Sequence, residues 1–201
     1  DLQGFANSSG IGRHVEIMRR MADAGARLHL VVWEPPPTPG EPDFTVAGAR
    51  RWRVLAGANV QLAARFHVAN IRHIASLGLR LHAIELSNEP DGSWNIRIAP
   101  ADYVALVKAV RAEAARRGVA LPRIYGPGAS RSVTTRPYLA DPKTARELIA
   151  LVDVFSLHTW DDAVGKDRVG ELEAVFADLA RLGPVPPIAI TEYGLGRIDP
   201  T

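Results

Sequence analysis

The feature that most constrains the fold of this chain is an alternation of short apolar runs with longer segments of helical character. The runs are nearly continuous in Val, Ile, Leu and Ala, which is typical of strands buried on both faces of a parallel sheet. They cover 27–33, 79–87, 152–158 and 187–192, with weaker runs at 122–125 and 2–6. Repeated strand and helix predict an α/β protein with right-handed crossovers.

The segments between the runs are predicted to be helices. Four of them stop directly before a glycine, the residue that most readily takes the left-handed conformation of a helix C-cap. These helices cover 15–24, 61–77, 102–117 and 171–182, and a shorter one is predicted at 141–151. Each helix therefore has a defined end before the next strand begins.

The spacing of the strand ends selects one architecture. Most consecutive ends lie roughly 26 to 37 residues apart, close to the step of a (β/α)8 TIM barrel of ~250 residues. One step is longer because it contains a loop at 34–48, which has five prolines and is expected to lack regular structure. The alternative, a doubly wound sheet, normally has a glycine-rich phosphate loop, and the stretch at 4–12 does not fit that spacing. We predict one partial barrel domain over 1–201, with about six of the eight βα units.

Composition excludes several classes of protein. The chain has no cysteine, which rules out disulfides, thiolate metal sites and a cysteine nucleophile. A net charge of +2 with interspersed signs gives no stripe for nucleic acid, and no apolar stretch approaches the ~20 residues of a membrane span. The high pI of 9.2 comes mostly from arginine, a bias typical of bacterial coding.

Two carboxylates fall at strand ends. Glu89 and Glu192 each follow an apolar run, and the carboxyl ends of barrel strands form the active-site face. Two carboxylates on different strands at the same end, with aromatic and amide neighbours, indicate a general acid paired with a nucleophile.

The residues around these glutamates resemble a known family. The segments LSNEP (86–90), FSLHTW (155–160) and ITEYG (190–194) together resemble the clan A retaining glycoside hydrolases. The segment VVWEPPP (31–37) makes family 30 the most similar, with family 39 or 5 next. In that clan the acid/base ends strand four and the nucleophile strand seven. Glu89 and Glu192 end the third and sixth predicted strands, so we expect strands one and eight to lie outside this chain.

The resemblance implies roles for individual residues. Glu192 is expected to be the nucleophile and Glu89 the acid/base, with the pKa of Glu89 raised by the negative charge on Glu192. Asn88 is expected to bind the sugar 2-hydroxyl. His158 is expected to donate to the sugar or to a carboxylate.

The aromatic residues of the motifs are expected to contact substrate. Many relatives have tyrosine where this chain has Trp160, which cannot accept a hydrogen bond, and Tyr193 could supply the missing hydroxyl. Trp33, Trp94 and Trp160 could stack on sugar rings. The resemblance implies an oligosaccharide or polysaccharide substrate and an extracellular or periplasmic location. We expect no cofactor.

Two other functions compete with this one. A metal-dependent hydrolase needs clustered ligands, and the sequence has neither His-x-His nor Glu-x-x-His, so no metal is expected. A non-catalytic carbohydrate-binding barrel is the second alternative. A gap between the two carboxyl groups much beyond ~6 Å, or one filled by Trp160, would favour the binding barrel.

One further pair is predicted inside the barrel. His29 and Glu85 each lie four residues before a predicted strand end, so they share the inward-facing parity of neighbouring strands. We expect their side chains to meet as a polar pair.

Overall fold

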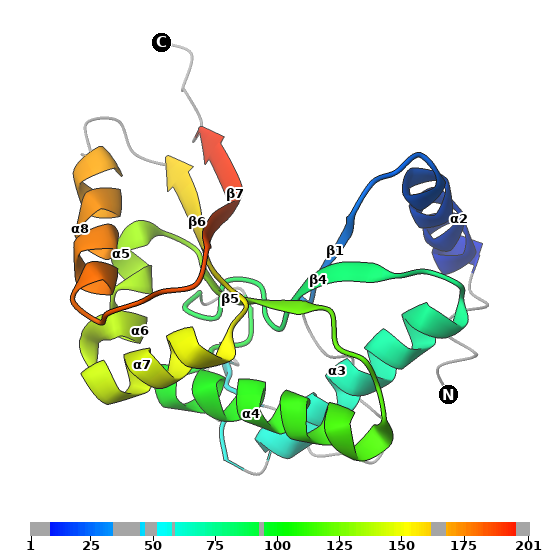
Figure 1. Cartoon of the computed structure of the whole chain (residues 1–201), viewed down its shortest axis with the longest axis horizontal. Coiled ribbons are helices and arrows are strands. Elements are labelled where there is room, and N and C mark those ends of the chain that lie inside the picture. Colours follow the sequence, from blue (N-terminus) through cyan, green and yellow to red (C-terminus); the bar gives the residue numbers. More distant parts are fainter. Residues whose placement is uncertain are drawn as a thin grey trace.

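The computed structural model describes residues 9–33, 45–46, 52–57, 59–92, 95–161 and 168–195. Five parallel strands form one sheet, in the order β1-β4-β5-β6-β7. These strands are β1 (Leu28–Val31), β4 (Leu81–Glu85), β5 (Arg123–Ala129), β6 (Val154–Asp161) and β7 (Ile188–Leu195). Spatial order follows chain order, without the reversal of a doubly wound sheet. The sheet curls from β1 to β7 and forms part of a (β/α)8 barrel, as predicted (Figure 1).

Helices connect the strands and cover the convex side of the sheet (Figure 1). The long ones are α2 (Ser9–Asp23), α3 (Asn59–Ser76), α4 (Pro100–Arg117), α7 (Pro142–Leu151) and α8 (Arg168–Ala180). All five predicted helices are present. Two short helices, α5 (Ser132–Thr135) and α6 (Pro137–Ala140), were not predicted. None of the described helices is both long and apolar enough to cross a membrane.

The loop predicted at 34–48 contains more structure than expected at its end. Thr45–Val46 (β2) pairs antiparallel with Trp52–Arg53 (β3). Both strands follow the last of the five prolines, so their backbone N–H groups are free to pair. The predicted strand at 2–6 and residues 34–44 lie outside the described part of the chain.

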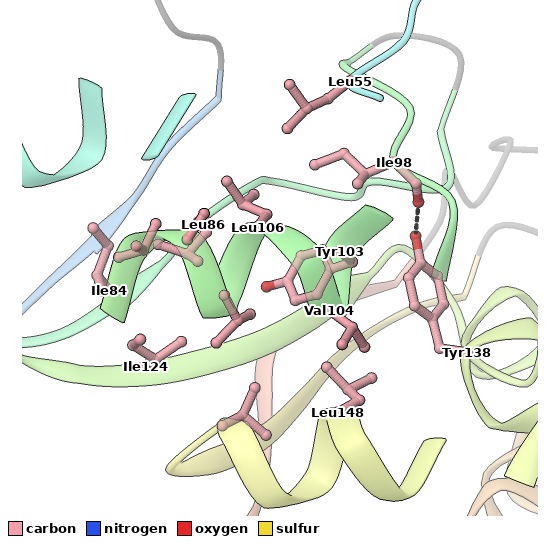
Figure 2. Close-up of a cluster of buried hydrophobic side chains, with 14 of the residues drawn as sticks. Leu55, Ile84, Leu86, Ile98, Tyr103, Val104, Leu106, Ile124, Tyr138 and Leu148 are labelled. Carbon is pink, nitrogen blue, oxygen red and sulfur yellow. Dashed lines mark hydrogen bonds between the residues drawn. The ribbon is translucent and has the colours of Figure 1, made fainter. Parts of the chain in front are cut away.

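The core lies between the sheet and the helices. Ile84 of β4 and Ile124 of β5 pack on Tyr103 and Leu106 of α4, all of them fully buried (Figure 2). The ring of Tyr103 reaches close to the sheet at Gly126, where an added Cβ would lie 2.4 Å from the tyrosine hydroxyl oxygen. Glycine is therefore required at this point for α4 to approach the strands.

His67 makes the stability of the fold sensitive to acid. This histidine of α3 is buried, its Nδ1 has no partner in the described part of the chain, and burial lowers its pKa to about 4. Between pH 6.5 and 4 the unfolded chain binds a proton at His67 that the folded chain does not, so stability falls as the pH falls. The loss is on the order of 3 kcal/mol.

Replacing this histidine should remove the effect. We expect His67→Leu to flatten the decline in unfolding free energy between pH 6.5 and 4, as measured by urea titration at several pH values. His14→Leu, at an exposed position of α2, is the matched control and should keep the full slope. An unchanged slope in His67→Leu would contradict this assignment.

Candidate active site

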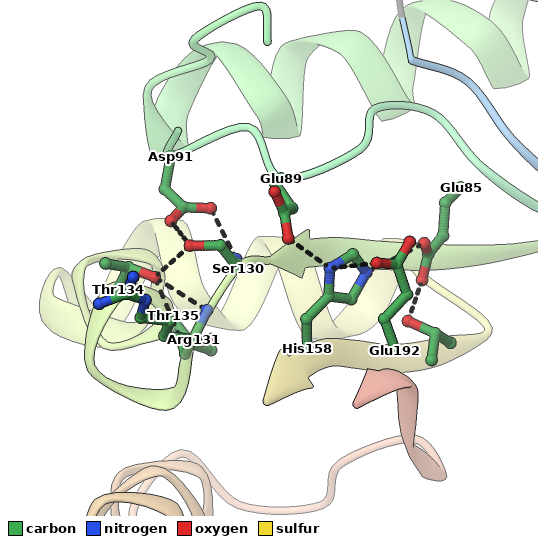
Figure 3. Close-up of polar contacts among 10 residues, drawn as sticks. Glu85, Glu89, Asp91, Ser130, Arg131, Thr134, Thr135, His158 and Glu192 are labelled. Carbon is green, nitrogen blue, oxygen red and sulfur yellow. Dashed lines mark hydrogen bonds and ion pairs between the residues drawn. The ribbon is translucent and has the colours of Figure 1, made fainter. Parts of the chain in front are cut away.

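The site lies on the concave side of the sheet, where residues from β4, β6 and β7 converge (Figure 3). His158 of β6 is in register with Glu192 of β7, which brings both side chains to the same face. Glu89 lies four residues after the end of β4. The two glutamates are three strands apart in the sheet, which confirms the predicted interval. Glu192 lies inside β7, however, and not at its end.

The backbone at Glu89 has an unusual conformation. Its φ is +45°, the only positive value found for a non-glycine residue in the described part of the chain. This left-handed conformation is rare for glutamate and stores strain, and such strain is common at functional sites. The Glu89 N–H donates to the Gly128 carbonyl at 3.1 Å, and the Glu89 carbonyl accepts from the Gly92 N–H at 2.9 Å. These bonds hold the turn that directs the carboxylate toward His158.

The two carboxylates are close enough to act on one bond. His158 Nδ1 lies 3.1 Å from Glu89 Oε1 and 3.7 Å from Glu192 Oε2. One oxygen of Glu89, one of Glu192 and a ring nitrogen of His158 all lie within 4.8 Å of one another. Retaining glycosidases hold their two carboxyl groups about 5 to 5.5 Å apart. The two carboxylates are therefore not separated by the gap much beyond ~6 Å that was expected to favour a binding barrel.

The charges at the site are coupled through His158. Burial alone would lower the pKa of His158, but Glu85 and Glu89 beside the ring and the charge of Glu192 raise it to about 9. Burial also raises the pKa of Glu192, with Glu89 and Glu85 adding to the effect and His158 opposing it. The imidazole is thus a cation at neutral pH. The predicted rise in the pKa of Glu89 stays a prediction.

The same three side chains are the one group in the described residues with the spacing of a metal site. A metal ligand must be a neutral imidazole, whereas His158 holds its proton up to about pH 9. The positive charge of the protonated ring already offsets the negative charge of the surrounding carboxylates. The arrangement fits an imidazolium better than a metal ion, and the absence of a metal stays a prediction.

Asn88 is buried beside the glutamate pair. Its side chain is 1% exposed, and both amide atoms lack a partner among the described residues. Its backbone N–H donates to the Val32 carbonyl at 2.9 Å, which ties the segment before Glu89 to the end of β1. A buried amide without partners is costly unless a ligand satisfies it. This is consistent with the expected contact to a sugar hydroxyl.

The predicted aromatic contacts have different outcomes. Trp160 shares the parity of His158, and its ring lies over Gly194, where an added Cβ would be 2.1 Å from a ring carbon. The indole therefore packs on Gly194, two residues after Glu192 on β7. Trp33 is exposed two residues after β1. Trp94 lies outside the described residues.

Tyr193 is the residue that was expected to support the nucleophile. It is 82% exposed, and it follows Glu192 directly on β7. Thr191 and Glu192, the two residues before it on β7, both reach the cluster around His158 and Glu85 because the pairing with β6 shifts register there, so strand alternation does not fix the direction of the Tyr193 hydroxyl. That Tyr193 supplies the missing tyrosine hydroxyl stays a prediction.

The predicted His29–Glu85 pair is also different in the structure. Glu85 hydrogen-bonds Thr191 and faces His158, while the His29 ring packs edge-on against Tyr125 at 4.9 Å between centroids. Burial lowers the pKa of His29, and the charge of Glu85 partly opposes this. The two residues influence each other electrostatically without forming a hydrogen bond or an ion pair. Thr191 was missed, although its position beside Glu192 in ITEYG was a signal.

Comparison with known proteins identifies the fold. No family model and no curated protein matches the chain. Among solved structures, a GH30 endoxylanase from Clostridium papyrosolvens C71 matches with a TM-score of 0.57 and 17% identity over 98% of this chain and 55% of its own. An endo-laminarinase from Formosa Hel1_33_131 matches with 0.56 and 18% identity, over 94% and 55%. The endo-β1,6-glucanase BT3312 matches with 0.60 and 14% identity, over 88% and 40%.

At these identities the likeness establishes the fold and not the activity. The chain spans about half the length of these solved structures, or less. The matched structures include a family 30 enzyme, the family that the sequence motifs resemble. The chain therefore has the fold of part of the clan A barrel found in family 30 glycoside hydrolases.

Proposed function

We propose that this chain carries the catalytic pair of a retaining glycoside hydrolase that cleaves β-glycosidic bonds. The observation that supports it most is the approach of Glu89 and Glu192 oxygens to within 4.8 Å of each other. The strained backbone of Glu89 adds to this support, as does the amide of Asn88, which has no partner among the described residues. Surface carboxylates have no need of either feature.

The reaction proceeds in two displacements. In the first, the Glu192 carboxylate attacks the anomeric carbon, the glycosidic C–O bond breaks, and Glu89 gives its proton to the leaving oxygen. In the second, Glu89 takes a proton from water, the water oxygen attacks the anomeric carbon, and the bond to Glu192 breaks. The negative charge moves from Glu192 to Glu89 and back, and the His158 cation lies within 3.7 Å of both.

The substrate is proposed to be a β-linked oligosaccharide or polysaccharide. The matched structures include an endoxylanase, an endo-laminarinase and an endo-β1,6-glucanase, all named for polysaccharides. The exposed rings of Trp33 and Trp160 offer surfaces on which sugars can stack. An extracellular or periplasmic location in a bacterium accompanies this proposal, since polymers of this kind are degraded outside the cell.

The stereochemistry of the product tests the proposal. The chain is incubated with a panel of aryl β-glycosides and β-linked oligosaccharides, and proton NMR records which anomer forms first. We expect the β-anomer first, together with covalent labelling of Glu192 by a 2-fluoro glycoside, located by peptide mass. First release of the α-anomer would exclude the retaining mechanism. Oligosaccharide binding without turnover would indicate the binding barrel instead.

A further inference from the structure

The two-displacement reaction does not use Glu85, although this residue is the most buried carboxylate of the site. Its side chain is 0% exposed at the end of β4. Glu85 Oε1 accepts a hydrogen bond from the Thr191 hydroxyl at 2.7 Å, and Oε2 lies 3.7 Å from His158 Nε2 (Figure 3). Residues from β6 and β7 therefore hold a carboxylate that belongs to β4.

The neighbouring strand leaves room for this carboxylate. Gly128 of β5 has a φ of +66°, and a Cβ added there would lie 3.2 Å from the Glu85 carboxyl carbon and from one carboxyl oxygen. A side chain at 128 would thus be strained by the backbone and would crowd Glu85. Four strands of the sheet are arranged around one buried negative charge.

The geometry around His158 fixes the protonation of its ring. Nδ1 faces the carboxylates of Glu89 and Glu192, and Nε2 faces that of Glu85. A neutral imidazole has one N–H, so when Glu89 and Glu192 are both ionised either tautomer directs a lone pair at a carboxylate. Only the imidazolium presents an N–H on both sides. The raised pKa of His158, about 9, agrees with this argument.

We propose that Glu85 is a positioning residue, which holds His158 as an imidazolium with its Nδ1–H directed at the glutamate pair. Its consequence for turnover rests on the proposed function. The reaction moves negative charge between Glu192 and Glu89. His158 stays protonated beside both, because the Glu85 carboxylate on the opposite side of the ring stabilises the positive charge. Without the Glu85 charge, His158 would lose its proton at a lower pH, and the two glutamates would lose their shared counter-ion.

Other charged and titratable groups near this arrangement are few among the described residues. Glu89 and Glu192 face His158 directly. Burial lowers the pKa of His29 of β1 and raises that of Tyr103 of α4, and the charge of Glu85 acts to raise both. Tyr125 of β5 contacts the His29 ring. None of these groups places a carboxylate at His158 Nε2. A substitution of Glu85 would therefore remove the negative charge on that side of the ring.

The test is a titration of the His158 ring in Glu85→Gln, which keeps the shape of the side chain and removes its charge. NMR of labelled histidine follows the ring, and the signal is assigned by its loss in His158→Gln. We expect the proton affinity of His158 to fall about tenfold or more. Glu85→Asp keeps the charge, so it should retain a higher affinity than Glu85→Gln, and it provides the measurement if Glu85→Gln does not fold. Glu147→Gln, at a surface glutamate paired with Lys108, is the control and should leave His158 unchanged.

Kinetics provide the second readout. In Glu85→Gln the pH profile of kcat/KM should change, because the charge of His158 beside Glu89 and Glu192 changes, while activity at the optimum persists in part. Glu147→Gln should leave the profile unchanged. An unchanged His158 titration in Glu85→Gln would overturn the inference, even if the chain hydrolyses glycosides. A shifted titration in a chain that turns over no glycoside would uphold the charge arrangement and count against the proposed function alone.

Discussion

Glu192→Ala is expected to lower kcat on aryl β-glycosides by on the order of 10⁵-fold, because no other described carboxylate can form the covalent intermediate. Glu85 is fully buried, and Glu89 is needed to protonate the leaving oxygen. The smaller alanine leaves space beside the anomeric carbon. Azide at high concentration should enter that space and restore turnover, because it replaces the missing nucleophile while Glu89 still protonates the leaving oxygen.

The product of the rescue identifies the residue removed. If Glu192 is the nucleophile, azide attacks from its side and gives the α-glycosyl azide from a β-glycoside. Glu89→Ala is the matched variant, and azide should give the β-glycosyl azide there, since the covalent intermediate still forms. NMR of the two products distinguishes them. The reverse pattern would exchange the roles of the two glutamates.

His158→Ala is expected to destabilise the fold by about 3 to 5 kcal/mol, the usual result of removing one partner from a buried ion pair. The variant leaves Glu85 fully buried without its cation, and leaves Glu89 and Glu192 without the charge between them. Urea unfolding at neutral pH measures the loss. A loss below about 1 kcal/mol would show that His158 is not charged in the folded chain.

The pH dependence of that loss has a defined sign. The folded pKa of His158, about 9, lies above its ordinary value of 6.5, so its contribution is complete below pH 6.5 and disappears as the pH rises through 9. The difference between the parent and His158→Ala should therefore shrink in this window. His158→Ala combined with Glu85→Gln should recover part of the stability, because the fully buried side chain at position 85 then carries no charge. His14→Ala is the control at an exposed histidine.

The sequence pattern predicted most of the sheet and its helices because most of its strands are nearly continuous apolar runs and four of the five long helices are closely followed by a glycine. It missed α5 and α6, which have four residues each and are shorter than any periodicity that can be recognised. It placed Glu192 at a strand end, whereas β7 continues pairing with β6 as far as Leu195. Pairing depends on the partner strand, which a local pattern does not contain.

The candidate site was predictable in its residues and less so in its contacts. The motifs indicated Glu89, His158 and Glu192, and the structure brings them together. Inward parity was right for Glu85, but its partner comes from β6 and β7 and not from β1. Parity gives the face of a strand, whereas the stagger between strands decides which side chains meet across a barrel.

The left-handed backbone of Glu89 sets stability against activity at a single position. Glycine adopts that conformation without strain, so exchanging Glu89 for glycine would make the folded chain easier to form and would remove the proposed general acid together. A barrel that only held sugars would gain from the exchange. Keeping a glutamate at position 89 imposes a continuing folding penalty, and the proposed proton transfer would account for it.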